Sequence, residues 1–147
     1  MNEINILTND YLFKFKKAFL EVLNAFQKIF NYSKKLIVDV LITNDLEMQK
    51  ISKSTRQIDK TTDVLSFPFA MNCEEFNFIH LGEIILSFEQ IQRQAKQFNH
   101  SIKREFCFLF AHGLVHLHGL DHKQNLEQEM NFNQFVYNIM EMVKIRR

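Results

Sequence analysis

Apolar residues change their spacing from one segment of the chain to the next, and this spacing predicts the elements. Ile4, Ile6 and Leu7 are typical of a short opening strand. From about Asn9, apolar residues recur every three or four positions, which is the period of an amphipathic helix. Asn9 or Asp10 is a suitable residue to cap the start of this helix. Its apolar stripe consists of Phe15, Phe19, Val22, Phe26 and Ile29.

Three more strands and a short helix are predicted in the middle of the chain. Residues 36–42 form a compact apolar run that is rich in β-branched side chains, which indicates a buried strand. Asn44–Asp45 can cap a short helix that continues to about Lys53. Residues 63–67 and 81–86 are two further strand candidates, and the segment between them has no recognisable pattern.

After the last predicted strand the helical period returns and predicts three helices. Ser101 is a suitable N-cap for the second of them. The residues that mark the first helix are Ile91, Ala95 and Phe98. The inward-facing residues of the second are Phe106, Leu109, Phe110 and Gly113. The residues that mark the third are Met130, Phe135, Ile139 and Val143.

The predicted order of elements is therefore β, α, β, α, β, β, α, α, α. Four strands and about five helices in one chain favour an α/β (α+β) fold, with a mixed sheet covered by helices. A length of 147 residues fits one domain and leaves little room for two. We expect residues 1–147 to form a single domain without internal repeats or linkers.

Composition narrows the class of protein further. The net charge is +1, so contact with a polyanion would need a local cluster of basic residues. Apolar runs are much shorter than the roughly 20 residues of a membrane-spanning helix. The first residues lack the pattern of a signal peptide. The two cysteines, Cys73 and Cys107, do not have the spacing of a metal site, and we expect both to be reduced thiols. We therefore expect a cytoplasmic protein with no membrane partner.

The most informative segment contains three histidines with the spacing of a metal site. His112 and His116 are four residues apart, so on a helix their Cβ atoms lie about 6 Å apart on one face. Gly119 can end that helix in the left-handed conformation and turn the chain, after which His122 can complete the set. Three histidines with a fourth position left open are typical of catalytic zinc, although imidazole also suits other divalent metals. The metal site is thus expected on this helix and the turn that follows it.

The same spacing occurs in metzincin proteases, HExxHxxGxxH. Gly113 stands where those enzymes have their glutamate general base, which argues against a peptidase. His118 lies about 200° around the helix from His116, so packing or contact with solvent is its expected role. His80 and His100 have no partner in the sequence, and no function is assigned to them.

Several blocks of the chain resemble the YbeY family of bacterial RNA-processing metalloproteins. The segment HGLVHLHGLDH, residues 112–122, matches the family pattern HGxLHLxGxDH, and TDVLSFP, residues 62–68, matches a second block that Arg56 precedes. The segment LGEI, residues 81–84, resembles the family's LGDI. The departures from the family pattern are Val115 for leucine, Glu83 for aspartate, Thr61 for proline and Gln134 for a glutamate near Met130.

This resemblance implies a zinc-dependent endoribonuclease that is specific for single-stranded RNA. It implies a role in rRNA maturation, especially at the 3′ end of 16S rRNA, and in ribosome quality control, with rRNA and ribosomal particles as partners. The implied zinc ligands are His112, His116 and His122, and Arg56 is the implied catalytic or phosphate-binding arginine. No small-molecule cofactor is implied. Asp121 can orient a histidine, act as a base through water, or cap the turn, and the residues leave these roles open.

A patch that tracks RNA phosphates is a further expectation beside the site. Lys53, Arg56 and Lys60 can form it, and its RNA affinity should fall as salt rises. An extension of the patch would consist of Arg93, Lys96, Lys103 and Arg104.

The rival interpretation of the whole chain is a ribosome assembly factor in which zinc only stabilises the fold. The sequence leaves the oligomeric state open.

Overall fold

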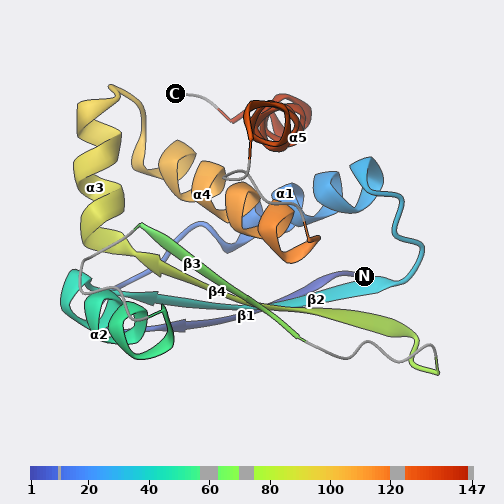
Figure 1. Cartoon of the computed structure of the whole chain (residues 1–147), viewed down its shortest axis with the longest axis horizontal. Coiled ribbons are helices and arrows are strands. Elements are labelled where there is room, and N and C mark those ends of the chain that lie inside the picture. Colours follow the sequence, from blue (N-terminus) through green and yellow to red (C-terminus); the bar gives the residue numbers. More distant parts are fainter. Residues whose placement is uncertain (10, 57–62, 70–74, 120–124, 146–147) are drawn as a thin grey trace.

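The computed structural model describes residues 1–9, 11–56, 63–69, 75–119 and 125–145, with the side chains of residues 55 and 56 excepted. Within this part the chain forms four strands and five helices in the predicted order (Figure 1). The strands are β1 (Glu3–Thr8), β2 (Lys35–Thr43), β3 (Val64–Pro68) and β4 (Phe78–Ser87). The helices are α1 (Lys16–Ile29), α2 (Asp45–Arg56), α3 (Phe88–Gln97), α4 (Ile102–Leu117) and α5 (Leu126–Val143).

The strands form one mixed sheet in the order β1-β2-β4-β3. β1, β2 and β4 are parallel, and the edge strand β3 runs antiparallel to β4. Successive side chains of a strand point to opposite faces, and in β2 the buried positions Leu36, Val38, Val40 and Ile42 alternate with partly exposed ones. The predicted α/β fold, a four-stranded mixed sheet with five helices, is confirmed.

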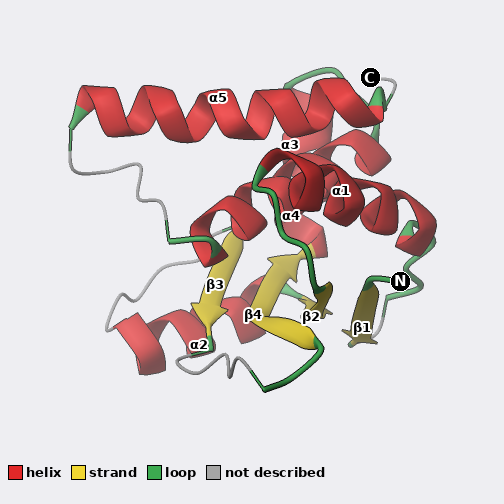
Figure 2. Cartoon of the chain, turned by 90° about the vertical axis from the view of Figure 1, so that its right-hand side faces the viewer, coloured by secondary structure: helices red, strands yellow, loops and turns green. Residues whose placement is uncertain are grey.

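Three of the helices cover one face of the sheet. Figure 2 shows α5 running across α1 and α4 on their outer side, so that α4 lies between the sheet and α5. The core between sheet and helices contains several fully buried phenylalanines. Phe19 of α1 and Phe110 of α4 are both fully buried, and their rings stack with centroids 4.2 Å apart. The central helix α4 therefore packs on the sheet on one side and on α5 on the other, with α1 beside it.

The opposite face of the sheet carries a smaller apolar cluster under α2. Met48 of α2 is fully buried against Leu65 of β3 and Ile85 of β4, which are register partners. Asn44 accepts a hydrogen bond from the backbone N–H of Glu47 at 2.9 Å, which confirms its predicted capping role. None of the helices in the described residues is long and apolar enough to cross a lipid bilayer.

The start of α1 differs from the sequence prediction. The helix begins at Lys16 with Phe15 in the N-cap position and no side-chain cap, so the prediction of a start near Asn9 was wrong. The backbone N–H of Asn9 instead donates to the carbonyl of Ile42, which continues the pairing of β1 with β2. Asp10, the other predicted cap, lies outside the described residues. Between strand and helix, the rings of Phe13 and Phe15 pack on the buried Phe106.

The four apolar residues that predict the last helix all lie in α5, but they are not equally buried. Met130 is 63% exposed, Ile139 is buried, and Phe135 and Val143 are partly buried. The fully or nearly buried residues of α5 are Phe132, Val136, Ile139 and Met140.

Candidate metal centre

α4 presents two of the three predicted metal ligands side by side. Its N-cap is Ser101, which accepts a hydrogen bond from the backbone N–H of Arg104 at 3.0 Å, as predicted. About three and four turns later, His112 and His116 are half-buried on one face, with ring centroids 5.1 Å apart and planes at 69°. The expected pairing of these imidazoles is confirmed. Imidazole rings at this separation can both supply a nitrogen to one ion.

Gly113 sets the distance between α4 and the sheet. A Cβ atom at this position would lie 3.0 Å from both Cδ1 and Cγ2 of Ile84 in β4. Only a residue without a side chain allows the helix backbone to approach the sheet this closely. His112 and His116 therefore lie on a helix whose backbone is in close contact with the sheet.

The turn after α4 begins as the sequence predicts. Leu117 ends the helix, His118 is its C-cap, and Gly119 has a φ of 106°, in the region that favours glycine. The N–H of Gly119 donates to the carbonyl of His116 at 2.9 Å. Asp121 and His122 lie outside the described residues, so the third ligand and the candidate base stay predictions.

Among the described residues, no three histidine, cysteine, aspartate or glutamate side chains come together as a metal-binding group. The rings of two predicted ligands lie next to each other, and the third predicted ligand belongs to the segment 120–124. The donor chemistry fits zinc, because imidazole nitrogens are among its preferred ligands. The pair is also half-buried rather than sealed in the core, which leaves it within reach of an ion and of a substrate.

His118 packs away from the pair, as predicted. Its ring lies against Phe30, with centroids 4.0 Å apart, and its Nδ1 is 2.6 Å from the hydroxyl oxygen of Tyr32. Burial lowers the pKa of His118 and raises the pKa of Tyr32. Near neutral pH both groups are therefore uncharged, which favours an arrangement in which the phenol donates to an unprotonated Nδ1.

The other two described histidines contact carboxylates elsewhere in the fold. His100 Nε2 lies 2.7 Å from Oε1 of the buried Glu105, which also accepts a hydrogen bond from Gln94. His80 Nε2 lies 3.2 Å from Oδ2 of Asp39 on the neighbouring strand. Glu105 of α4 thus joins Gln94 of α3 and His100 of the loop between the two helices, and the second pair links β2 with β4.

The basic residues expected around the site are described only in part. Arg56 is the last residue of α2, with its side chain outside the described part, and Lys60 lies in the segment 57–62. Lys53 is exposed on α2. Because α2 covers the face of the sheet opposite α4, the described part of this patch lies across the sheet from the helix that carries the histidines (Figure 1).

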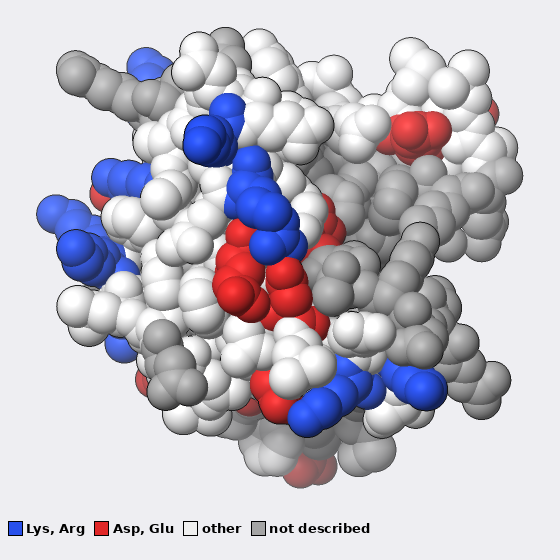
Figure 3. Space-filling model, turned by 90° about the vertical axis from the view of Figure 1, so that its left-hand side faces the viewer, with Lys and Arg blue, Asp and Glu red and all other residues white. Residues whose placement is uncertain are grey.

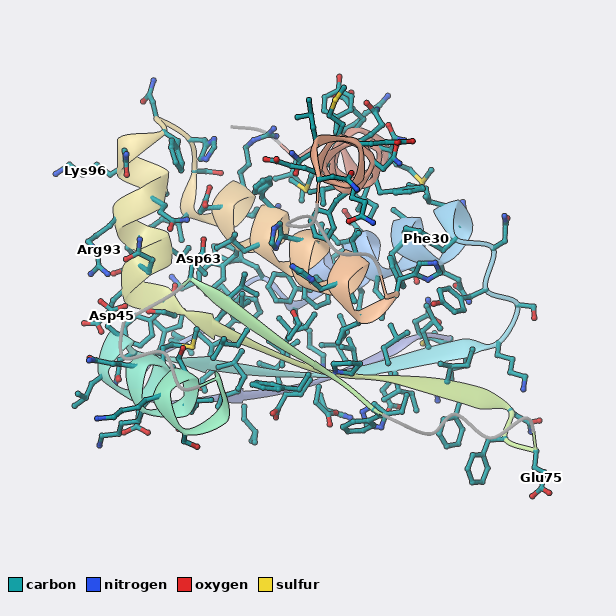
Figure 4. The ribbon with its side chains drawn as sticks, viewed as in Figure 1. Phe30, Asp45, Asp63, Glu75, Arg93 and Lys96 are labelled. Atoms are coloured by element: carbon teal, nitrogen blue, oxygen red, sulfur yellow. The ribbon has the colours of Figure 1, made fainter. Side chains whose placement is uncertain are left out.

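The proposed extension of the basic patch is partly engaged within the protein. Arg93 forms an ion pair with Asp45 at 2.5 Å, and Arg104 donates to the carbonyl of Ile145 at 2.9 Å. Figure 4 shows Arg93 and Lys96 on α3, at the opposite end of the molecule from Phe30. Figure 3 shows acidic and basic side chains side by side on this face rather than one basic stripe. An RNA path over α3 has little support from these contacts.

The sequence did not single out Phe132, which contacts both candidate ligands. Its ring centroid lies 4.7 Å from that of His112 and 4.8 Å from that of His116. The only signal available was its spacing of four and seven residues from Val136 and Ile139, which matches a helical stripe.

Comparisons with known proteins agree with the resemblance of the motif blocks. The profile of the family described as "Endoribonuclease YbeY" matches residues 3–144. The protein named Endoribonuclease YbeY of Mycoplasmopsis pulmonis is 45% identical over 150 residues, covering 100% of both chains. Its namesake in Mycoplasma mobile is 42% identical and covers 99% of this chain and 97% of its own.

A solved structure shows the same fold. The solution structure of TM1509 from Thermotoga maritima superimposes with a TM-score of 0.59 at 24% identity, covering 96% of this chain and 91% of that one. The profile match and the full-length relatives together establish the family, and the chain belongs to the endoribonuclease YbeY family.

Proposed function

We propose that this protein is a zinc-dependent endoribonuclease that cuts single-stranded RNA. The observation that carries the proposal is the His112–His116 pair on α4, with adjacent half-buried rings, in a chain of the endoribonuclease YbeY family. His122, three residues after Gly119, is the proposed third ligand. Three imidazoles leave the fourth position of a tetrahedral zinc site open, as catalytic sites require.

Hydrolysis of RNA forms a P–O bond from water and breaks the P–O bond to the leaving ribose oxygen. One proton must therefore leave the water, and one must reach the leaving oxygen. When bound, zinc supplies a Lewis acid that lowers the pKa of water toward about 7. The three histidines hold and orient that centre, and Gly113 keeps their helix close to the sheet.

Arg56 and Asp121 have proposed roles around the histidines. The planar guanidinium of Arg56 can bind two oxygens of a phosphate at once, a geometry that lysine cannot supply. Asp121 can orient a histidine, take the proton from water, or cap the turn. Its position next to His122 in the sequence is compatible with all three roles.

Ribosomal RNA is the proposed substrate, in particular the 3′ end of 16S rRNA, with ribosomal particles as partners in the cytoplasm. Family membership and the motif blocks support this choice. A role in ribosome quality control belongs to the same proposal.

The test measures cleavage of a single-stranded precursor 16S rRNA fragment by protein loaded with one equivalent of zinc. We expect the wild type to cut it and His116→Ala to abolish cleavage while staying folded. His80→Ala is the matched control, because it removes a histidine from the sheet, and it should cut like the wild type.

The rival function gives a different result in the same experiment. A zinc-loaded wild type that cuts no RNA, yet binds ribosomal particles and loses thermal stability when zinc is chelated, would be a non-catalytic assembly factor. That outcome would refute the endoribonuclease proposal.

A further inference from the structure

A third ring, supplied by another helix, contacts both candidate ligands. Phe132 of α5 is fully buried, and its ring meets that of His112 at an interplanar angle of 68° and that of His116 at 57°. With centroid separations of 4.7, 4.8 and 5.1 Å, the three rings form a nearly equilateral triangle. The contact with His112 is edge-to-face, an arrangement that aromatic rings prefer, and the contact with His116 is tilted.

The helix that carries the two histidines cannot fix the orientation of their rings by itself. α4 determines where each Cβ atom lies, but the χ2 torsion of histidine is broad and two-fold. Rotation about this torsion changes which ring nitrogen faces an ion. A side chain that packs against both rings removes this freedom, and Phe132 lies in that position.

Phe132 is itself held firmly. It belongs to the buried stripe of α5, together with Val136, Ile139 and Met140, and this stripe joins the main apolar core. One turn further along, the ring of Phe135 lies 4.7 Å from that of Phe30, which ties α5 to the end of α1. The position of the phenylalanine ring is thus set by the packing of a whole helix.

We infer that Phe132 is a positioning residue of the metal centre, which orients the imidazoles of His112 and His116 and forms the apolar side of the site. The inference rests on the proposed function in so far as these histidines bind zinc. Packing around metal ligands tunes affinity as well as geometry, because it limits ring motion and the access of water. None of the motif blocks includes Phe132, since the last of them ends at His122.

The experiment compares Phe132→Leu with a matched control, Phe19→Leu. Both replacements remove a fully buried phenylalanine ring from a helix and retain an apolar side chain that favours helix, but Phe19 packs on Phe110 in the core. Unfolding in urea without metal first establishes the stability of each variant. Zn²⁺ and Co²⁺ affinities are then measured by competition with a chelator, and the visible absorption bands of the Co²⁺ form report the coordination geometry.

We expect Phe132→Leu to bind both metals about tenfold more weakly than Phe19→Leu, because loss of packing around metal ligands has effects of this size. Its Co²⁺ absorption bands should also change in position or intensity, whereas those of Phe19→Leu should match the wild type. If Phe132→Leu fails to fold, Phe132→Met keeps more of the buried volume and lacks the flat ring, so the same result is expected from it.

Wild-type affinity and an unchanged Co²⁺ spectrum in the Phe132 variants would overturn the inference and leave the proposed function intact. Equal weakening in Phe132→Leu and Phe19→Leu would overturn it as well, because it would reflect lost stability alone. If the wild type binds no metal, the proposed zinc chemistry fails, and the inference fails with it.

Discussion

The hydroxyl of Tyr32 lies 2.6 Å from Nδ1 of His118, which joins the loop after α1 to the residue that caps α4. The ring of His118 also packs on Phe30, the C-cap of α1. His118 follows the candidate ligand His116 by two residues. The contact therefore anchors the end of α4 at the point where the chain leaves it toward His122.

Removing this hydrogen bond should have a modest cost. We expect Tyr32→Phe to lower the free energy of unfolding by about 0.5–1 kcal/mol, which is the lower part of the range for a neutral hydrogen bond. The cost is small because His118 is exposed, so water can take the place of the phenol. Urea unfolding of Tyr32→Phe, His118→Leu and the double variant measures the coupling between the two residues. Strictly additive effects would show that the hydrogen bond contributes nothing.

A methyl group at position 113 should push α4 away from the sheet. Gly113→Ala gains up to about 1 kcal/mol of helix propensity, but its Cβ meets two atoms of Ile84 at 3.0 Å. Overpacking of this kind costs about 1–3 kcal/mol. We therefore expect net destabilisation in urea unfolding.

The variant Ile84→Val provides the control for that prediction, because it removes Cδ1 and leaves Cγ2 in place. Gly113→Ala should cost less in the Ile84→Val background than in the wild type. An equal cost in both backgrounds would place the origin of the effect outside the contact with Ile84.

Glu83 should destabilise the fold at neutral pH. Burial and the neighbouring Asp39, its register partner in β2, raise the pKa of Glu83. Like charges directly opposite each other in a sheet repel. Because the native state binds the proton more tightly than the unfolded state does, the contribution of Glu83 to stability is present at low pH and is lost as pH rises through its native pKa.

Glu83→Gln should accordingly raise the free energy of unfolding at pH 7, and the gain should disappear near pH 4. Thermal unfolding of both proteins between pH 4 and 8 measures this difference. A gain that stays constant over that range would show that the charge of Glu83 is not its cause.

Cys107 should be inert in the folded protein. Burial raises its pKa to about 12, from an ordinary value of 9.0. At pH 8 the native thiolate fraction is then about 10⁻⁴, and thiolate is the reactive form. In a Cys73→Ser variant, the reaction with a disulfide reagent should be at least roughly 10²-fold slower in native than in unfolded protein. Similar rates in both states would contradict the burial of this thiol.

The raised pKa of Cys107 also predicts how stability depends on pH. Above about pH 9 the thiol loses its proton in the unfolded protein but keeps it in the folded protein, so the free energy of unfolding should fall.

The elements and their order could be predicted from the sequence, because hydrophobic spacing is a local property. Ser101 and Asn44 cap the helices that their positions predict. The start of α1 and the inward face of α5 could not be predicted in the same way. Residues 11–15 are apolar enough for a helix, yet their aromatic rings pack on Phe106 in a non-helical segment. In α5, Met130 and Phe132 are both apolar, and only the partners of the helix decide which of them is buried.

The same division holds at the candidate metal centre. The sequence by itself determined the pairing of His112 with His116, because a spacing of four places two residues on one face of any α-helix. It also determined the end of the helix, since Gly119 has a φ of 106°, a conformation that favours glycine. The close contact between Gly113 and Ile84, in contrast, depends on the packing of α4 on the sheet. Only the tertiary structure decided that Phe132 of α5 meets both imidazoles and that Tyr32 meets His118. These contacts join residues that are 16 to 86 positions apart, and the packing of whole helices, rather than any local pattern, brings them together.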